Sequence, residues 1–200
     1  MEKWNVKNLL ILGAGGIGSH LVEHLYKLML NGQISMDTNI TVSDNDKVEL
    51  KNISYQNFTD KDILKNKAVV IGDRYGFVGQ DRKIVDDREL MDFDSVVICV
   101  DNSKARKLVY DWAYKNKRQF IDLRAEGRQI AVITSDLKES EAKDMLPKEI
   151  NGNGGSCQLK YRFENQVIDV GNIVVAAIGS QILLNKLRGE QSNDKLILRV

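Results

Sequence analysis

The chain has 200 residues, of which 29 are lysine or arginine and 28 are aspartate or glutamate, giving a formal net charge of +1. This balance argues against a broad surface for nucleic acid or for an anionic membrane. The two cysteines, Cys99 and Cys157, are too few for a disulfide framework or a cysteine-only zinc site. The longest apolar run, 173–184, is too short and too polar to cross a bilayer. We therefore expect one domain over 1–200, soluble and cytoplasmic, that binds neither nucleic acid nor membrane.

A glycine-rich turn follows the first apolar run, 9–12, and leads into a helix-like pattern. In nucleotide-binding α/β folds, the first glycine of such a turn permits the sharp bend. The middle glycines let a pyrophosphate approach the backbone, and the last lets the helix pack on the sheet. The corresponding residues here are Gly13, Gly15, Gly16 and Gly18. Taken alone, the turn indicates either a nucleotide site, with an NAD-dependent oxidoreductase as the first interpretation, or a tight structural turn.

Two carboxylates come directly after the second predicted strand, 39–43. Asp44 and Asp46 therefore lie at the C-terminal edge of the predicted sheet, where an acidic side chain hydrogen-bonds a ribose in folds of this kind. The same residues are also ordinary turn formers. The stretch that follows, 48–73, is polar and helix-like, without clear boundaries.

Strands and helices then alternate along the chain. The expected strands are 83–85, 95–100, 120–122, 129–133 and 195–200, and the expected helices are 105–113, 135–148 and 172–187. The late helix is apolar on more than one face, so we expect it to be buried in the fold or packed on a partner subunit. This order predicts the α/β fold class, as a Rossmann-like, mostly parallel sheet with helices on both faces and mixed C-terminal strands.

Beyond the glycine turn, several polar and small-residue motifs follow one another. They are Asp44-x-Asp46, Asn52, Tyr55-Gln56, Lys67-Ala68, Asp101-Asn102 with Arg106, Arg124-Ala125-Glu126-Gly127, and Ala176-Ala177-Ile178-Gly179-Ser180-Gln181. This ordered series resembles the pattern of the ThiF/MoeB/HesA family of ubiquitin-like-protein activating enzymes. The resemblance covers most of residues 8–133 and returns at 170–189.

Members of that family bind ATP and Mg²⁺ and adenylate the C-terminal glycine of a small ubiquitin-like protein, releasing pyrophosphate. The resemblance implies an ATP-dependent adenylyltransferase that works as a homodimer through its late helix. Its partner would be a ubiquitin-like or sulfur-carrier protein ending in Gly-Gly, or a peptide. Asp101 would be the Mg²⁺ ligand, and Asn52 and Lys67 would contact the phosphates. The residues implied to bind the nucleotide are Gly13, Gly15, Gly16, Asp44 on the ribose, Asp46, Gln56 and Lys67.

Two of these assignments have an alternative. Asp101-Asn102 is also suited to capping the helix that begins near Ser103. Lys65 is the alternative to Lys67, because the spacing from Gln56 to Lys67 is one residue shorter than in the relatives. Both alternatives stay open from the sequence.

The two cysteines and the two histidines differ in what they indicate. Cys157 lies in the flexible crossover loop expected near 148–160, where some family members carry a cysteine that takes the acyl group as a thioester. It is therefore a catalytic candidate, or else a loop cysteine with no group that activates its thiol. Cys99 is expected in the core. His20 and His24, one helical turn apart, are expected to form a surface stripe rather than a metal site.

Tyr55 occupies the position of a family arginine that stabilises the triphosphate. Removing a cationic clamp from transferring phosphates lowers the reaction rate by orders of magnitude. Lys51, Lys61 and Arg74 are the candidate substitutes. Alternatively, a partner protein supplies the arginine, or the chain is a nucleotide-binding scaffold without adenylation activity.

Overall fold

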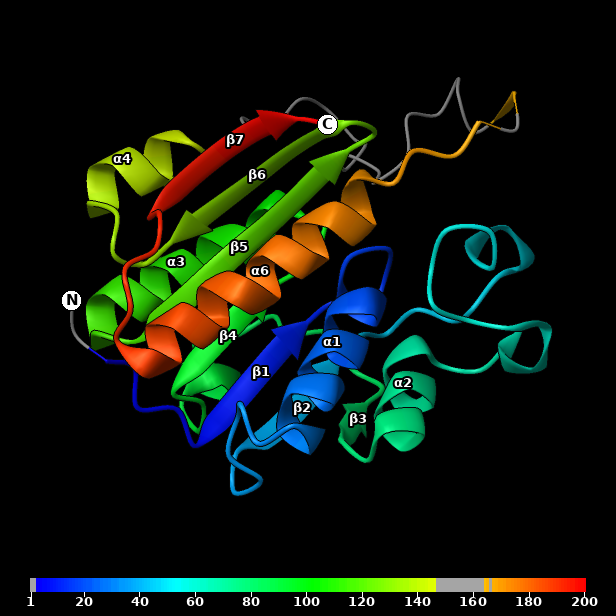
Figure 1. Ribbon diagram of the computed structural model, residues 1–200, viewed down its shortest axis with the longest axis horizontal. Helices are drawn as coiled ribbons and strands as arrows, with labels where there is room; N and C mark the ends of the chain where they lie inside the picture. The colour runs from blue at the N-terminus through cyan, green and yellow to red at the C-terminus, as the bar shows by residue number, and fades with distance from the viewer. Residues whose placement is uncertain (1–2, 147–163, 166) are drawn as a thin grey trace.

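The structure, a computed structural model, describes residues 3–146, 164–165 and 167–200. Within these ranges, a seven-stranded sheet has the order β3-β2-β1-β4-β5-β6-β7 (Figure 1). The first five strands run parallel, and β6 and β7 are antiparallel to their neighbours. This confirms the predicted fold class. The strands are β1 (Asn8–Leu12), β2 (Asn39–Ser43), β3 (Val78–Gln80), β4 (Ser95–Ile98), β5 (Gln119–Glu126), β6 (Gln129–Thr134) and β7 (Lys195–Arg199).

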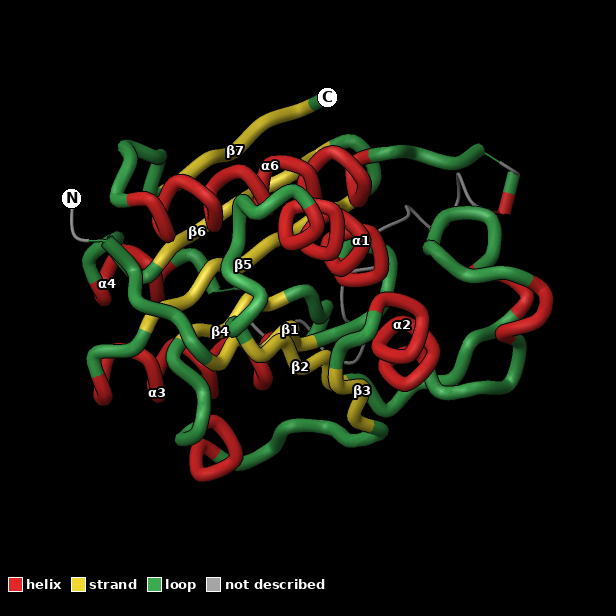
Figure 2. Tube along the Cα trace, turned by 60° about the horizontal axis from the view of Figure 1, so that its bottom comes forward, coloured by secondary structure: helices red, strands yellow, loops and turns green. Residues whose placement is uncertain are grey.

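Helices cover both faces of the sheet (Figure 2). Successive side chains of a strand point to opposite faces, so β1 contributes to two cores. Leu9 and Ile11 pack with α1, α2 and α6, whereas Leu10 and Leu12 pack with α3 and α4. None of the helices in the described ranges combines the length and the apolar character needed to span a membrane. The helices are α1 (Gly18–Leu30), α2 (Lys67–Tyr75), α3 (Ser103–Asn116), α4 (Glu139–Asp144) and α6 (Gly171–Arg188).

The late helix α6 belongs to the core. It packs on β5, β6 and α1, and Val175, Ala176 and Leu183 are fully buried. Gly179 permits a close approach, because a Cβ at this position would lie 2.5 Å from Cδ1 of Leu123. Burial in the fold, one of the two expectations for this helix, is therefore confirmed. The homodimer stays a prediction.

The predicted strand at 83–85 is wrong, because the third strand forms earlier, at Val78–Gln80. This strand packs against the backbone of α2, where a Cβ on Gly79 would lie 2.4 Å from the carbonyl oxygen of Ala68. Only glycine allows that contact, and a glycine weakens a strand pattern in a sequence. The segment at 83–85 instead places Ile84 in the α3-side core.

The stretch 48–73 is not a continuous helix. It contains the 3₁₀ turns η1 (Leu50–Asn52) and η2 (Asp60–Asp62), and α2 begins only at Lys67. Asn66 caps α2, since its Oδ1 accepts a hydrogen bond from the N–H of Val69 at 2.9 Å. Polar side chains of this kind compete with helical hydrogen bonds, which explains why the pattern gave no boundaries.

A buried carboxylate joins α3 to β5. Asp122 is fully buried, and its oxygens accept hydrogen bonds from Arg106 Nε at 3.1 Å, Tyr110 Oη at 2.9 Å and Arg124 Nη2 at 2.7 Å. Burial and the Asp122 charge raise the pKa of Tyr110, so the phenol keeps its proton. Asp122 pairs in register with Ile98, the last residue of β4. The cluster therefore supports the point at which the chain leaves β4 for α3.

We predict that Asp122→Ala lowers the free energy of unfolding by about 3–5 kcal/mol, because it leaves buried guanidinium groups without a counter-ion. Asp111 provides the matched control on the exposed side of α3, where it pairs with Lys107 and Lys143 while 40% of its side chain remains exposed. Asp111→Ala is expected to cost about 1 kcal/mol or less. Urea-induced unfolding measures both, and equal losses would contradict this account.

Candidate functional site

A pocket of about 330 Å³ lies at the C-terminal ends of β1, β2 and β4. The strand order reverses between β1 and β4, which is where ligands bind in open α/β sheets. The pocket brings together the sequence-predicted site residues that the structure describes. Cys157 and the crossover loop expected near 148–160 lie outside the described residues. The predicted residues that line the pocket are Gly13, Gly15, Gly16, Asp44, Asp46, Asn52, Gln56, Lys67 and Asp101.

The glycine turn forms one wall of this pocket. Gly13 has φ +98°, a conformation that favours glycine. A Cβ on Gly18 would lie 1.9 Å from the carbonyl oxygen of Gly13, so Gly18 serves the turn itself as well as helix packing. By contrast, a Cβ on Gly15 would meet no atom within 4 Å, and this residue faces the pocket.

The start of α1 presents hydrogen-bond donors at this wall. In the part of the chain that the structure describes, no acceptor takes the backbone N–H groups of residues 15–18, whereas the next N–H, of Ser19, already bonds to the Gly15 carbonyl at 3.0 Å. Free N–H groups at a helix N-terminus favour an anion. The turn is therefore built to hold a phosphate group.

Asp44 fixes the glycine turn to the end of β2. Its Oδ2 accepts from the N–H of Ala14 at 2.7 Å, and its Oδ1 accepts from the N–H of Asp46 at 2.8 Å. Burial raises the pKa of this carboxyl group, and the two N–H groups act in the opposite direction. Each carboxylate oxygen has more than one acceptor site. Asp44 can therefore also accept a hydroxyl donor from a ligand.

Lys67, rather than Lys65, reaches the pocket. Its side chain is 8% exposed, and its Nζ lies 3.2 Å from Oδ2 of Asp46. Lys65 lines a different pocket on the outer side of α2, together with Asp62 and Arg74. Of the two lysines that the sequence left open, only Lys67 is positioned to face a ligand over the glycine turn.

The segment that carries Asn52, Tyr55 and Gln56 forms another wall. Asn52 is buried, its Oδ1 accepts from the N–H of Glu49 at 2.9 Å, and its Nδ2 lies 3.5 Å from the Tyr55 hydroxyl. Gln56 is 8% exposed, and its Oε1 has no hydrogen-bond donor among the described residues. A buried acceptor without a donor is unfavourable. Gln56 therefore lines the pocket with a side chain whose buried oxygen is left unsatisfied by the described residues.

Asn102 and Asp101 have separate roles at the end of β4. The Oδ1 of Asn102 caps α3, accepting from the N–H groups of Lys104 at 2.8 Å and Ala105 at 3.3 Å. Asp101 is exposed in the pocket. Among the described residues, no three histidine, cysteine, aspartate or glutamate side chains gather as a metal-binding group. One carboxylate nevertheless fits Mg²⁺, which takes its remaining ligands from water and substrate phosphates.

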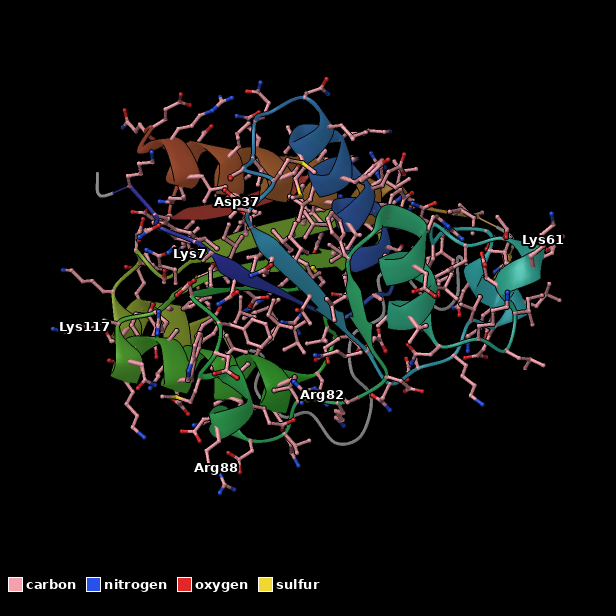
Figure 3. The ribbon with its side chains drawn as sticks, turned by 90° about the horizontal axis from the view of Figure 1, so that it is seen from below. Lys7, Asp37, Lys61, Arg82, Arg88 and Lys117 are labelled. Carbon is pink, nitrogen blue, oxygen red and sulfur yellow. The ribbon has the colours of Figure 1, made fainter. Side chains whose placement is uncertain are left out.

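The three candidate substitutes for the family arginine occupy different places. Lys51 lines the pocket and pairs with Glu49 at 2.9 Å. Arg74 donates to Asp62 and to the Asn57 carbonyl, both at 2.5 Å, outside the pocket. Lys61 lies at the outer end of the loop that precedes α2 (Figure 3). Only Lys51 of the three lies beside Tyr55 in the pocket lining.

Sequence reasoning missed two pocket cations, Arg82 and Lys83. Arg82 lies near the end of β2 (Figure 3), and its carbonyl oxygen accepts from the Ser43 hydroxyl at 2.9 Å. Ile84 anchors the same segment in the core. The sequence does place two cations, Arg82 and Lys83, directly before the buried Ile84. Because 83–85 was predicted to be a strand, these cations were not assigned to the pocket.

The sequence pattern of the ThiF family matches residues 1–198. The chain belongs to the ThiF family. A comparison with curated protein sequences finds no match. The ordered motifs and the glycine turn are therefore those of a ThiF-family chain, as their resemblance indicated.

Similar solved structures include E. coli MccB with AMPCPP and MccA. Its TM-score is 0.69 and its sequence identity is 16%, and the match covers 97% of this chain and 60% of the MccB chain. E. coli MccB with ATP has a TM-score of 0.66 at 17% identity, with 98% of this chain covering 61% of that one. PaaA has a TM-score of 0.71 at 18% identity, and the match covers 97% of this chain and 61% of the PaaA chain. At these identities the likeness is one of fold. The ThiF-family chain spans about three fifths of the length of these proteins.

We predict that two glycine substitutions separate the structural and binding roles of the turn. Gly18→Ala is expected to lower the free energy of unfolding by about 2 kcal/mol, as overpacked positions do. Gly15→Ala meets open space, so it is expected to leave the unfolding free energy unchanged and to weaken ATP binding. Urea unfolding and ATP titration measure the two effects. Unchanged ATP affinity in Gly15→Ala would contradict the assignment of this space to a ligand.

Proposed function

We propose that this ThiF-family chain uses ATP to adenylate the C-terminal carboxylate of a peptide or of a small ubiquitin-like or sulfur-carrier protein. The observation that carries the proposal is the joint presence of the free N–H groups of the glycine turn, Asp44, Asn52, Lys67 and Asp101 around one pocket. MccB, which has a similar fold, has been crystallised with ATP and with AMPCPP and MccA together. This supports the proposal that a fold of this kind holds a nucleotide and a second molecule.

The proposed reaction is a displacement at the α-phosphorus of ATP. A carboxylate oxygen of the acceptor forms a bond to this phosphorus, the bond to the bridging oxygen breaks, and pyrophosphate leaves with the electron pair. The nucleophile is already an anion, so no general base has to remove a proton. The protein's task is to orient the two anions and to stabilise the charge on the leaving group.

Each proposed role follows from the chemistry of one side chain. Lys67 and Asn52 bind the phosphates, Asp44 accepts from the ribose, and the N–H groups of the glycine turn face the triphosphate. Asp101 holds Mg²⁺, which supplies positive charge to the phosphate oxygens when bound. Asp46 then orients the Lys67 ammonium group through their ion pair.

Positive charge near Tyr55 decides between this function and a second candidate. Tyr55 cannot supply the charge of the family arginine, which favours a nucleotide-binding scaffold without adenylation activity. Lys51, Arg82 and Lys83 line the same pocket and are the cations that the adenylation proposal requires. An arginine from a partner protein would serve the same purpose.

We extend the proposal to the whole chain. Residues 1–200 would act as a single cytoplasmic adenylation domain and as a homodimer. Cys157 would receive the activated acyl group as a thioester, in which its sulfur displaces AMP from the adenylate. A Cys157→Ser variant that processes its carrier at the full rate would contradict that covalent step.

Pyrophosphate exchange into ATP, in the presence of Mg²⁺ and a candidate acceptor, tests the adenylation directly. Lys67→Ala is expected to lower the exchange rate by about 10²–10³-fold, the loss typical of removing one preorganised group that stabilises charge. Lys65→Ala is the matched control, two residues away and outside the pocket, and its rate is expected to match the wild type. Absence of exchange in the folded wild type across a panel of acceptors would contradict adenylation. Tight ATP binding in that case identifies the scaffold.

Asp101 and Asn102 provide a second matched pair. We predict that Asp101→Asn raises the Mg²⁺ concentration needed for half-maximal exchange by about tenfold or more, because the metal loses its carboxylate ligand. Asn102→Ala is expected to cost about 1 kcal/mol of stability through the lost helix cap, with an unchanged Mg²⁺ requirement. If Asp101→Asn reduced only the thermal stability, the assignment of Mg²⁺ to this carboxylate would be wrong.

A further inference from the structure

Asn172, on α6, hydrogen-bonds to two walls of the pocket. It is the second residue of α6 and is 1% exposed. Its Nδ2 donates to the carbonyl oxygen of Gly16 at 3.0 Å and to that of Tyr55 at 2.8 Å. Gly16 belongs to the glycine turn and Tyr55 to the facing segment, and both line the pocket. One side chain therefore links three segments that are far apart in the sequence.

The hydrogen-bonding chemistry of this position selects an amide. The NH₂ group has two N–H donors, and the two carbonyl oxygens use both. Its Oδ1 is buried with no donor among the described residues. Turning the amide over would place this oxygen against two carbonyl oxygens, so the orientation is fixed. An apolar side chain would avoid an unsatisfied oxygen but would lose both hydrogen bonds.

The first hydrogen bond controls the glycine turn. In a trans peptide the carbonyl of one residue and the N–H of the next point in opposite directions. Holding the carbonyl of Gly16 on the α6 side therefore fixes the direction of the N–H of Ile17. This N–H is one of the donors that remain free at the start of α1.

The second hydrogen bond controls the opposite wall. The Tyr55 carbonyl also lies 3.3 Å from Nε2 of His20. Since a carbonyl only accepts, Nε2 is the donor, and burial lowers the pKa of this imidazole and favours its neutral form. His20 is only partly exposed, and its ring lies against the Tyr55 backbone. Together His20 and Asn172 fix the peptide that joins Tyr55 to Gln56.

The start of α6 is itself held in place. A Cβ on Gly171 would lie 2.2 Å from the carbonyl oxygen of Gly127, in the turn between β5 and β6. The helix therefore begins in direct contact with the turn of the β5–β6 hairpin. Asn172 is supported by a rigid element, as the group that orients a binding site needs to be.

We infer that Asn172 is a positioning residue, which sets the separation between the glycine turn and the Tyr55–Gln56 wall and thereby the fit of the ATP phosphates. The inference rests on the proposed nucleotide site. It does not require that the bound ATP be cleaved.

Asn172→Asp tests the inference through ATP binding, measured by isothermal titration between pH 5.5 and pH 8. At high pH the carboxylate faces two carbonyl oxygens, and the dissociation constant for ATP is expected to rise about tenfold or more above the wild-type value, or about 1.4 kcal/mol. A protonated carboxyl group donates one hydrogen bond. The ratio of the variant's dissociation constant to that of the wild type is therefore expected to fall towards one as the pH is lowered. His20 and the ATP phosphates titrate in both proteins, so the ratio removes their contribution.

Asn185→Asp is the matched control, because it makes the same substitution on α6, where Asn185 hydrogen-bonds Gln181 and the Gln191 carbonyl. Its ratio is expected to stay near one at every pH. If Asn172→Asp does not fold, Asn172→Ala gives the same comparison at one pH without an added charge.

A variant at 172 that folds and binds ATP as tightly as the wild type at pH 8 would overturn the inference. Failure of the wild type to bind ATP would overturn both this inference and the proposed function. ATP binding without pyrophosphate exchange would overturn adenylation alone.

Discussion

The carboxylate of Asp44 holds the glycine turn against the end of β2, and the shape of the pocket depends on this contact. Its hydrogen bond to Ala14 spans 2.7 Å and sets the direction in which the chain leaves β1. Gly13 and Gly18 then close the turn so tightly that a Cβ at 18 would overlap the carbonyl of Gly13. Because the turn is fixed at both ends, the N–H groups at the start of α1 meet a ligand in a defined geometry.

The remaining walls are fixed by contacts that lie outside the pocket. Asn172 holds the turn and Tyr55 together through 3.0 Å and 2.8 Å hydrogen bonds from α6. On the other face of the sheet, the buried Asp122 joins β5 to α3 through Arg106. Preorganised sites depend on such supporting contacts. The proposed adenylation site therefore draws on both cores of the domain, although the nucleotide itself would touch only the C-terminal edge of the sheet.

Local patterns were sufficient to predict the fold class and, together with the family resemblance, part of the pocket lining. The glycine turn, Asp44 and Asp101 were found because each directly follows an apolar strand. The prediction of a strand at 83–85 was wrong because β3 depends on the packing of Gly79 against α2. A local sequence pattern does not reveal this contact. Arg82 and Lys83 were missed for the same reason. The role of Asn172 depends on partners 156 and 117 residues away, and only the folded chain brings them together.

The central claim is that the pocket over the glycine turn is an ATP site and not a nicotinamide site. Titration of the purified protein with ATP and with NADH, each as a competitor of the other, measures this most directly. The account predicts saturable ATP binding that NADH does not displace, and loss of that binding in Asp44→Ala. Saturable NADH binding that ATP fails to displace would contradict it.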